Sequence, residues 1–193
     1  MTKDNRKKNS ELYVEKNGFS KNETKILKFL DKKLLDNKRH QRINAIADKL
    51  ISILKSKTED SLVWESLPLI FFGSGLPPGI RSSWVFVIKP NICTGAERHP
   101  NSHQRMMSFR GRGDLQVKEK EKWCSNFLVS TRALPLEKRW VSILPGTWHQ
   151  AITGDAYWTV VSFHTVPSDE LVEERPTNNK VFARRKYKRS KGA

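Results

Sequence analysis

Two stretches near the start of the chain repeat apolar residues with the period of an α-helix. The first helix is predicted from about Glu23 to Leu35, with Ser20 or Asn22 as its cap, and the second from about His40 to Ser56. The apolar positions that share one face are 26, 27, 30 and 34 in the first helix and 43, 46, 47, 50, 53 and 54 in the second. A helix-turn-helix is one reading of this pair, but nothing marks a recognition helix. We therefore expect both helices to pack against a folded core or a second subunit.

After residue 60 the pattern changes to short β-type segments separated by Gly and Pro turns. Strands are predicted at 67–72, 82–89, 105–109, 115–117, 126–130, 140–144, 149–153 and 156–166. A short acidic helical turn is expected after Pro167–Glu170. Strands about ten residues apart favour a β-sandwich or barrel. The fold class is therefore predicted as mainly β with an N-terminal α-helical extension.

Charge divides the 193-residue chain into three parts. Residues 1–58 hold 16 basic and 7 acidic residues, residues 180–193 hold 7 basic and no acidic residues, and residues 59–179 hold 13 of each. We interpret 1–58 as a basic helical extension that is frayed at its start, 59–179 as the barrel domain, and 180–193 as a basic, disordered tail. Nucleic acid is a candidate partner only through the two basic ends, since the middle is neutral.

The composition excludes several other classes of protein. No apolar run approaches the roughly 20 residues of a membrane span, and the polar N-terminus does not look like a secretory signal. Two cysteines, Cys93 and Cys124, make neither a disulfide framework nor a zinc knuckle, so we expect a cytoplasmic protein without a membrane partner. No nucleophile elbow, phosphate loop or dinucleotide fingerprint is present.

Four of the five histidines lie in the neutral middle of the chain. The segment from Thr94 to Gly113 places several polar groups just before a strand and a Gly turn, and the segment Leu144–His149 adds a histidine three residues after Gly146. Because side chains alternate along an extended chain, Glu97 and His99 can point the same way. Imidazole and carboxylate groups that converge suit a divalent ion.

The two segments resemble the paired motifs of the cupin superfamily. His99 and Gly111 match the second histidine and the closing glycine of the first motif, and Gly146 and His149 match the Gly-x2-His of the second. The resemblance covers about residues 82–166. It implies a small single-domain, cupin-like double-stranded β-helix, or jelly-roll, barrel.

The departures from the cupin pattern bear on the metal ligands. Glu97 stands where the first histidine is usual, Gln104 stands where the glutamate is usual, and only His99 and His149 match by type. Glu97 can supply a carboxylate oxygen instead of imidazole, and Gln104 or the adjacent His103 is the candidate fourth ligand. The candidate metal set is therefore Glu97, His99, His103, Gln104 and His149, for Fe, Mn, Ni or Zn.

Three further residues are candidates for binding a substrate. Arg105 either holds an anionic ligand or forms an ion pair outside the barrel. His164 either lines the pocket or lies on the surface, depending on which face of its strand is inside, and Trp148 is a candidate pocket wall.

Two functions are compatible with these residues. The first is a cupin-like, metal-dependent small-molecule enzyme, a dioxygenase, isomerase or related type. The second is a non-catalytic module that binds or senses a small ligand. A homodimer formed through edge strands and the helical extension is a further expectation.

Overall fold

Two capped helices open the described part of the chain. The computed structural model describes residues 18–57, 59–176 and 182–186, the last of these as backbone. Helix α1 spans Lys21–Leu35 and helix α2 spans Asn37–Ser56. The hydroxyl of Ser20 accepts a hydrogen bond from the Glu23 amide, and the Asp36 carboxylate accepts one from the Arg39 amide, so a side chain caps the start of each helix. The predicted helical extension is confirmed, while its expected frayed start lies outside the described residues.

The strands that follow pair antiparallel in two main sheets. They are β1 (Leu62–Ser66), β2 (Ser82–Ile88), β3 (Gln104–Arg110), β4 (Arg112–Glu119), β5 (Lys122–Cys124), β6 (Phe127–Val129), β7 (Trp140–Ile143), β8 (His149–Thr153), β9 (Trp158–His164), β10 (Val172–Pro176) and β11 (Phe182–Lys186).

Each sheet brings together strands that are far apart in the sequence, such as β2 with β9 and β4 with β8. One sheet has the order β1-β2-β9-β3-β7, and the other has β5-β4-β6 with β8 also paired to β4. Strands β10 and β11 pair with each other, so residues 182–186, which we assigned to the basic tail, form a strand. The rest of that tail lies outside the described residues. The predicted mainly β fold is confirmed, and none of the described helices could span a membrane.

One predicted strand is wrong. Residues 69–72 of the expected strand 67–72 form the short 3-10 helix η1 (Leu69–Phe72). Pro68 precedes it, and Gly73 ends it with a positive φ of 75°, a conformation that favours glycine. Phe72 is buried whereas Ile70 is 88% exposed, so the apolar run does not mark a strand buried on both faces.

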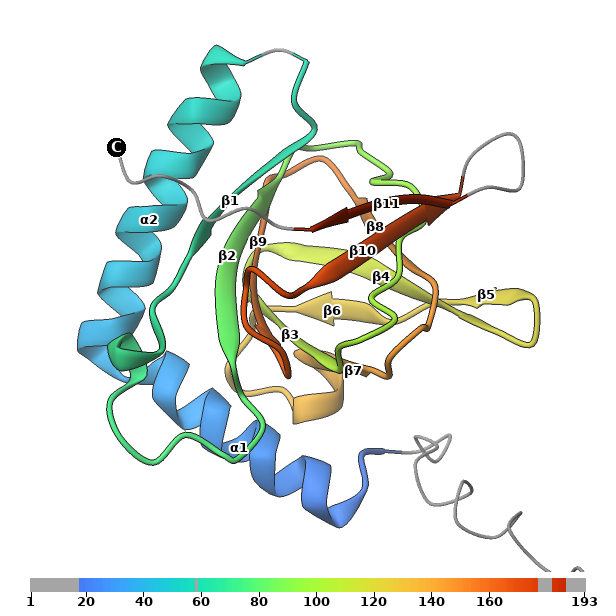
Figure 1. The fold of residues 1–193 in the computed structure, drawn as a ribbon. Coiled ribbons are helices and arrows are strands. Elements are labelled where there is room, and N and C mark those ends of the chain that lie inside the picture. Colours follow the sequence, from blue (N-terminus) through green and yellow to red (C-terminus); the bar gives the residue numbers. More distant parts are fainter. Residues whose placement is uncertain (1–17, 58, 177–181, 187–193) are drawn as a thin grey trace, which may run out of the picture.

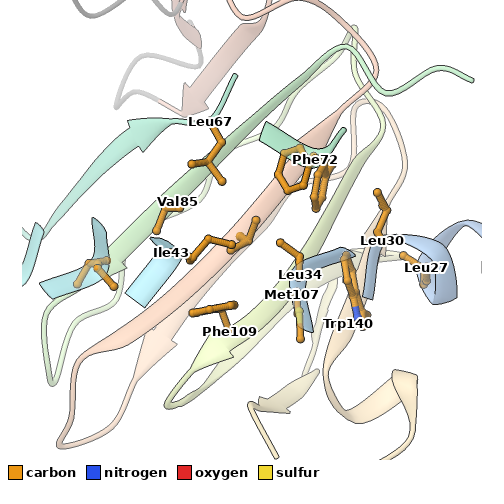
Figure 2. Close-up of a cluster of buried hydrophobic side chains, with 14 of the residues drawn as sticks. Leu27, Leu30, Leu34, Ile43, Leu67, Phe72, Val85, Met107, Phe109 and Trp140 are labelled. Carbon is orange, nitrogen blue, oxygen red and sulfur yellow. The ribbon is translucent and has the colours of Figure 1, made fainter. Parts of the chain in front are cut away.

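The five-stranded sheet is covered on both faces (Figure 1). On its outer face, side chains such as Val85, Met107 and Phe163 pack against α1 and α2, and Figure 2 shows this cluster between helices and strands. On its inner face, Met106, Trp158 and others pack with residues of the second sheet. Alternation along each strand sends neighbours to opposite layers, which is why β9 is buried along its whole length.

Trp158 closes the inner layer against the second sheet. Its indole N–H donates to the Ser108 hydroxyl at 2.9 Å, and its ring lies over Gly113 of β4. A Cβ at position 113 would lie 2.3 Å from the ring, so only glycine allows the two sheets to approach this closely.

Candidate metal centre

Backbone hydrogen bonds join the two segments that carry the cupin-like motifs. The amide of Glu97 donates to the His149 carbonyl, and the amide of His149 donates to the Glu97 carbonyl, both at 2.8 Å. The Gly146 amide donates to the His99 carbonyl at 2.9 Å, and Gly146 makes the turn with a φ of 76°. These bonds bring residues about fifty positions apart in the chain to one place inside the barrel.

Glu97, His99 and His149 form a cluster that is able to hold a metal ion. One ligand atom of each residue lies within 4.8 Å of the others, and both histidines are buried. The ring centroids of His99 and His149 are 5.4 Å apart. Glu97 Oε1 lies 3.5 Å from His149 Nε2. Two imidazoles and one carboxylate are a set that divalent iron, manganese, nickel and zinc accept.

In both imidazoles, a hydrogen bond from Nδ1 to a backbone carbonyl orients the ring. Nδ1 of His99 is 3.0 Å from the Val172 carbonyl, and Nδ1 of His149 is 3.0 Å from the Thr147 carbonyl. A carbonyl accepts hydrogen bonds only, so each Nδ1 carries a proton, and Nε2 is the nitrogen whose lone pair is available to a metal ion. This is the second-sphere arrangement that metal-binding histidines commonly have.

His149 Nε2 lacks a hydrogen-bond partner among the described residues, although it is buried. A nitrogen lone pair and a carboxylate oxygen 3.5 Å apart repel each other unless a metal ion or a proton on the ring lies between them. A metal ion at this position would satisfy both atoms, so the residues present fit such a group.

The charges around the cluster keep Glu97 ionised and His99 neutral. Burial alone would raise the pKa of Glu97, but His149 and His99 in their protonated forms, together with the Arg175 guanidinium, lower it to about 2. Burial and the neighbouring His149 lower the pKa of His99, against the opposing effect of Glu97. Each group is thus in the protonation state that a metal ligand requires.

A cavity of about 60 Å³ opens beside the cluster. Glu97, His149, Gln104, Thr94 and Arg175 form its polar part. The remaining lining is apolar and consists of Leu62, Trp64, Phe86, Ile88, Met106, Leu115, Ala151 and Val160. An apolar cavity with a few convergent polar groups is typical of a small-molecule site.

Two of the predicted site residues lie on the opposite face of β3. Arg105 donates to both oxygens of Glu23 at 2.7 and 2.8 Å, and His103 Nε2 lies 2.7 Å from the Ser142 hydroxyl. Of our two readings of Arg105, the structure shows the ion pair outside the barrel. The physical reason is strand alternation: Gln104 and Met106 face the cavity, so Arg105 faces α1.

Gln104, the other candidate fourth ligand, lines the cavity. It is 6% exposed, and its Nε2 donates to the Ser162 hydroxyl at 3.2 Å. Its Oε1 has no hydrogen-bond partner among the described residues.

His164 lies inside the barrel beside the cluster and outside the cavity lining. Its ring is edge-on to those of His99, at 5.1 Å, and Trp84, at 4.8 Å. Burial, reinforced by the charges of neighbouring histidines, lowers its pKa well below the ordinary value. Trp148 is likewise outside the described cavity lining, and the Arg98 guanidinium covers its ring at 4.6 Å.

The sequence pattern did not point to strand β10, which supplies a third side of the site. Arg175 forms an ion pair with Glu97, and it also donates to the Glu173 carboxylate at 2.8 Å and to the Thr94 carbonyl at 3.0 Å. Glu173 is fully buried. We expected a helical turn in this region, and the segment 171–176 lacks the alternation of apolar and polar residues that would have indicated a strand.

The comparisons with known proteins concern overall structure only, since no protein-family model and no curated protein matches the sequence. Similar solved structures include an oxalate oxidase in complex with the substrate analogue glycolate, which is 15% identical in sequence. This match covers 57% of this chain and 54% of that chain, with a TM-score of 0.44. The capsular polysaccharide assembling protein CapF from Staphylococcus aureus is 16% identical, and its match covers 58% of this chain and 30% of that chain with a TM-score of 0.45. The coconut allergen cocosin is 14% identical, and its match covers 62% of this chain and 29% of that chain with a TM-score of 0.45. The chain thus spans about half of the oxalate oxidase and less than a third of the other two.

Two antiparallel sheets of interleaved strands enclose the residues of both predicted motifs. The described residues thus form a mainly β barrel of two antiparallel sheets. Within this barrel, His149 lies on β8, and Glu97 and His99 lie on the 94–99 segment that bridges to it.

Proposed function

We propose that this protein is a cupin-like, metal-dependent enzyme that acts on a small molecule, of the dioxygenase, isomerase or related type. The observation that carries the proposal is the buried Nε2 of His149, which no described residue hydrogen-bonds and which faces Glu97 Oε1 at 3.5 Å beside a largely apolar cavity. Glu97, His99 and His149 would hold the divalent ion, and Gln104 is the remaining candidate from our predicted set. When bound, the ion would polarise a substrate oxygen or support chemistry with O2.

The protein's own residues have separate roles in this proposal. Trp64 and Phe86 hold the apolar body of the substrate and limit the entry of water into the cavity. Arg175 keeps the Glu97 carboxylate oriented by binding one of its oxygens, which leaves the other turned toward His149. The Val172 and Thr147 carbonyls hold the two imidazoles in the tautomer that presents Nε2.

The test is metal content after exposure to Fe2+ under anaerobic conditions and, separately, to Mn2+, Ni2+ and Zn2+. We expect one of these ions to be retained near one equivalent per chain after desalting. His149→Ala should lose it, and Glu97→Gln should weaken binding at least tenfold. His40→Ala is the matched control, because His40 lies on α2 with its ring 4.7 Å from Phe109. Retention of no ion, or equal retention by wild type and His149→Ala, would contradict the proposal.

A non-catalytic ligand-binding module is the second candidate, and the Arg175–Glu97 ion pair favours it. This pair already neutralises the carboxylate without a metal, and a proton on His149 would then complete the network. Such a module would bind none of the four ions, while its cavity would still take up a small ligand. The metal measurement therefore separates the two candidates.

A further inference from the structure

The cavity lining carries a buried hydrogen-bond acceptor outside the cluster of Glu97, His99 and His149. Gln104 is 6% exposed and lines the cavity from β3, and its Oε1 has no partner among the described residues. A buried carbonyl oxygen without a partner is unfavourable by an amount comparable to a lost hydrogen bond. Such an atom beside a cavity indicates that a ligand completes its bonding.

A chain of buried polar groups fixes which end of the Gln104 amide faces the cavity. Gln104 Nε2 donates to the Ser162 hydroxyl at 3.2 Å, and that hydroxyl lies 2.8 Å from His164 Nε2. His164 Nδ1 in turn lies 3.2 Å from the Ser102 hydroxyl. The Ser102 hydroxyl donates to the His103 carbonyl, so it accepts from His164 Nδ1–H. Nε2 of the neutral ring then accepts from Ser162, whose oxygen is left to accept from Gln104. The Gln104 nitrogen is thereby engaged, and its oxygen is directed at the ligand.

The surroundings of Gln104 Oε1 define the group that it would bind. An amide oxygen accepts hydrogen bonds and repels a carboxylate or phosphate oxygen. The Arg175 guanidinium, the cation of the cavity, is held by Glu97, Glu173 and the Thr94 carbonyl. Most of the remaining lining is apolar and includes Met106, Val160 and Leu115. The complement is a neutral O–H or N–H group on a small, mainly apolar molecule.

We infer that Gln104 selects the substrate of this site, by accepting a hydrogen bond from a neutral O–H or N–H donor on a small apolar molecule. Its role as a substrate-selecting residue rests on the proposed metal-dependent function. The binding preference itself does not need the metal. Ser162 and His164 are positioning residues that act through Gln104.

The test compares two rings of nearly the same size and shape that differ in the donor. Pyrrole carries an N–H group, and furan has an acceptor oxygen in its place. Binding of each to the full-length protein is measured by nuclear magnetic resonance titration, once after chelator treatment and once with the retained metal. We expect pyrrole to bind the wild type about five- to tenfold more tightly than furan in both states, the effect of one neutral hydrogen bond.

Gln104→Met keeps the length of the side chain and removes the acceptor, so it should bring the pyrrole-to-furan ratio close to one. The matched control is Gln116→Met, because Gln116 on β4 bonds to Asp114 and Gln150 and does not line the cavity. This control should keep the wild-type ratio. If Gln104→Met does not fold, the Gln104 side-chain amide resonance of the wild type serves instead, and it should shift with pyrrole and not with furan.

Equal binding, a preference for furan, a preference that survives Gln104→Met, or no binding of either ring would overturn the inference. These outcomes are distinct from failure of the proposed function. A protein that retains no metal but prefers pyrrole refutes the metal site alone. A protein that retains metal without preferring pyrrole refutes the role of Gln104 alone.

Discussion

At the residue scale, two imidazoles four positions apart in the chain lie in opposite layers of the protein. His99 faces the inside of the barrel, where burial and His149 lower its pKa. His103 faces α1, where burial and the charge of Arg105 lower its pKa to about 4, against the opposing effect of Glu23. Both rings are neutral at pH 7, but only the first has a carboxylate and a second imidazole within ligand distance.

The low pKa of His103 predicts a loss of stability in acid. An unfolded histidine has a pKa of about 6.5, so the unfolded chain binds the proton before the folded protein does. The free energy of unfolding should therefore fall as the pH falls from about 6.5 toward 4. Between pH 7 and pH 5 this residue should account for about 1–2 kcal/mol of the loss. Urea denaturation of the wild type and of His103→Gln at the two pH values measures it.

The pKa values of His99 and His164 are lowered in the same direction, so the difference between the wild type and His103→Gln isolates one residue. The variant should lose less stability than the wild type over the same interval. Parallel losses in the two proteins would show that His103 is not held neutral by the fold.

At the scale of elements, the helices dock on the sheet through acids that face inward. Glu23 of α1 binds the buried Arg105 of β3, and Asp31 of α1 binds both Arg139 and the indole of Trp140. By contrast, Asp48 of α2 pairs with Arg110 of β3 near the surface, where its side chain is 67% exposed. The same kind of ion pair thus occurs at two depths of one interface.

Removing the charge of Glu23 should destabilise the protein much more than removing that of Asp48. Glu23→Gln leaves the Arg105 guanidinium buried without its counter-charge, which typically costs about 3–5 kcal/mol. Asp48→Asn breaks an exposed pair, for which a cost below about 1 kcal/mol is expected. Chemical denaturation at pH 7 compares the two. Equal losses would mean that α1 does not depend on this buried pair.

Strand alternation also explains which site residues the sequence pattern placed well. Glu97, His99 and His149 came from a motif with fixed spacing, and the bonds between Glu97 and His149 put them in one cluster. The pattern did not fix the face of β3, because both of its faces are buried and neither is marked by polar alternation. Gln104 and Arg105 were therefore equally plausible as cavity residues, and the docking of α1 decided between them.

At the scale of the whole molecule, binding at the metal cluster is coupled to the stability of the barrel. The ligands come from segments about fifty residues apart in the chain, so an unfolded chain does not present them together. A ligand that binds only the folded state stabilises it by mass action.

Metal loading should therefore raise the melting temperature. At a free ion concentration 100 times the dissociation constant, the gain is about 2.7 kcal/mol. For a domain of this size that corresponds to a rise of roughly 5–10 °C. Differential scanning calorimetry of the chelator-treated and loaded protein measures the shift. His149→Ala should show none, whereas a full shift in that variant would place the bound ion elsewhere.

The sequence by itself determined both helices, the strands β2–β4 and β6–β9, the division of charge along the chain, and the two motif segments that hold Glu97, His99 and His149. These features are local, because they depend on periodicity, turn residues and spacing. Only the tertiary structure decided that Arg105 turns to Glu23, that Gln104 faces the cavity and that Arg175 reaches Glu97. The Arg105–Glu23 and Arg175–Glu97 contacts join residues 82 and 78 positions apart. The place of Gln104 depends on which face of the doubly covered sheet lines the cavity. No short-range pattern encodes such a choice, because it follows from the packing of whole elements.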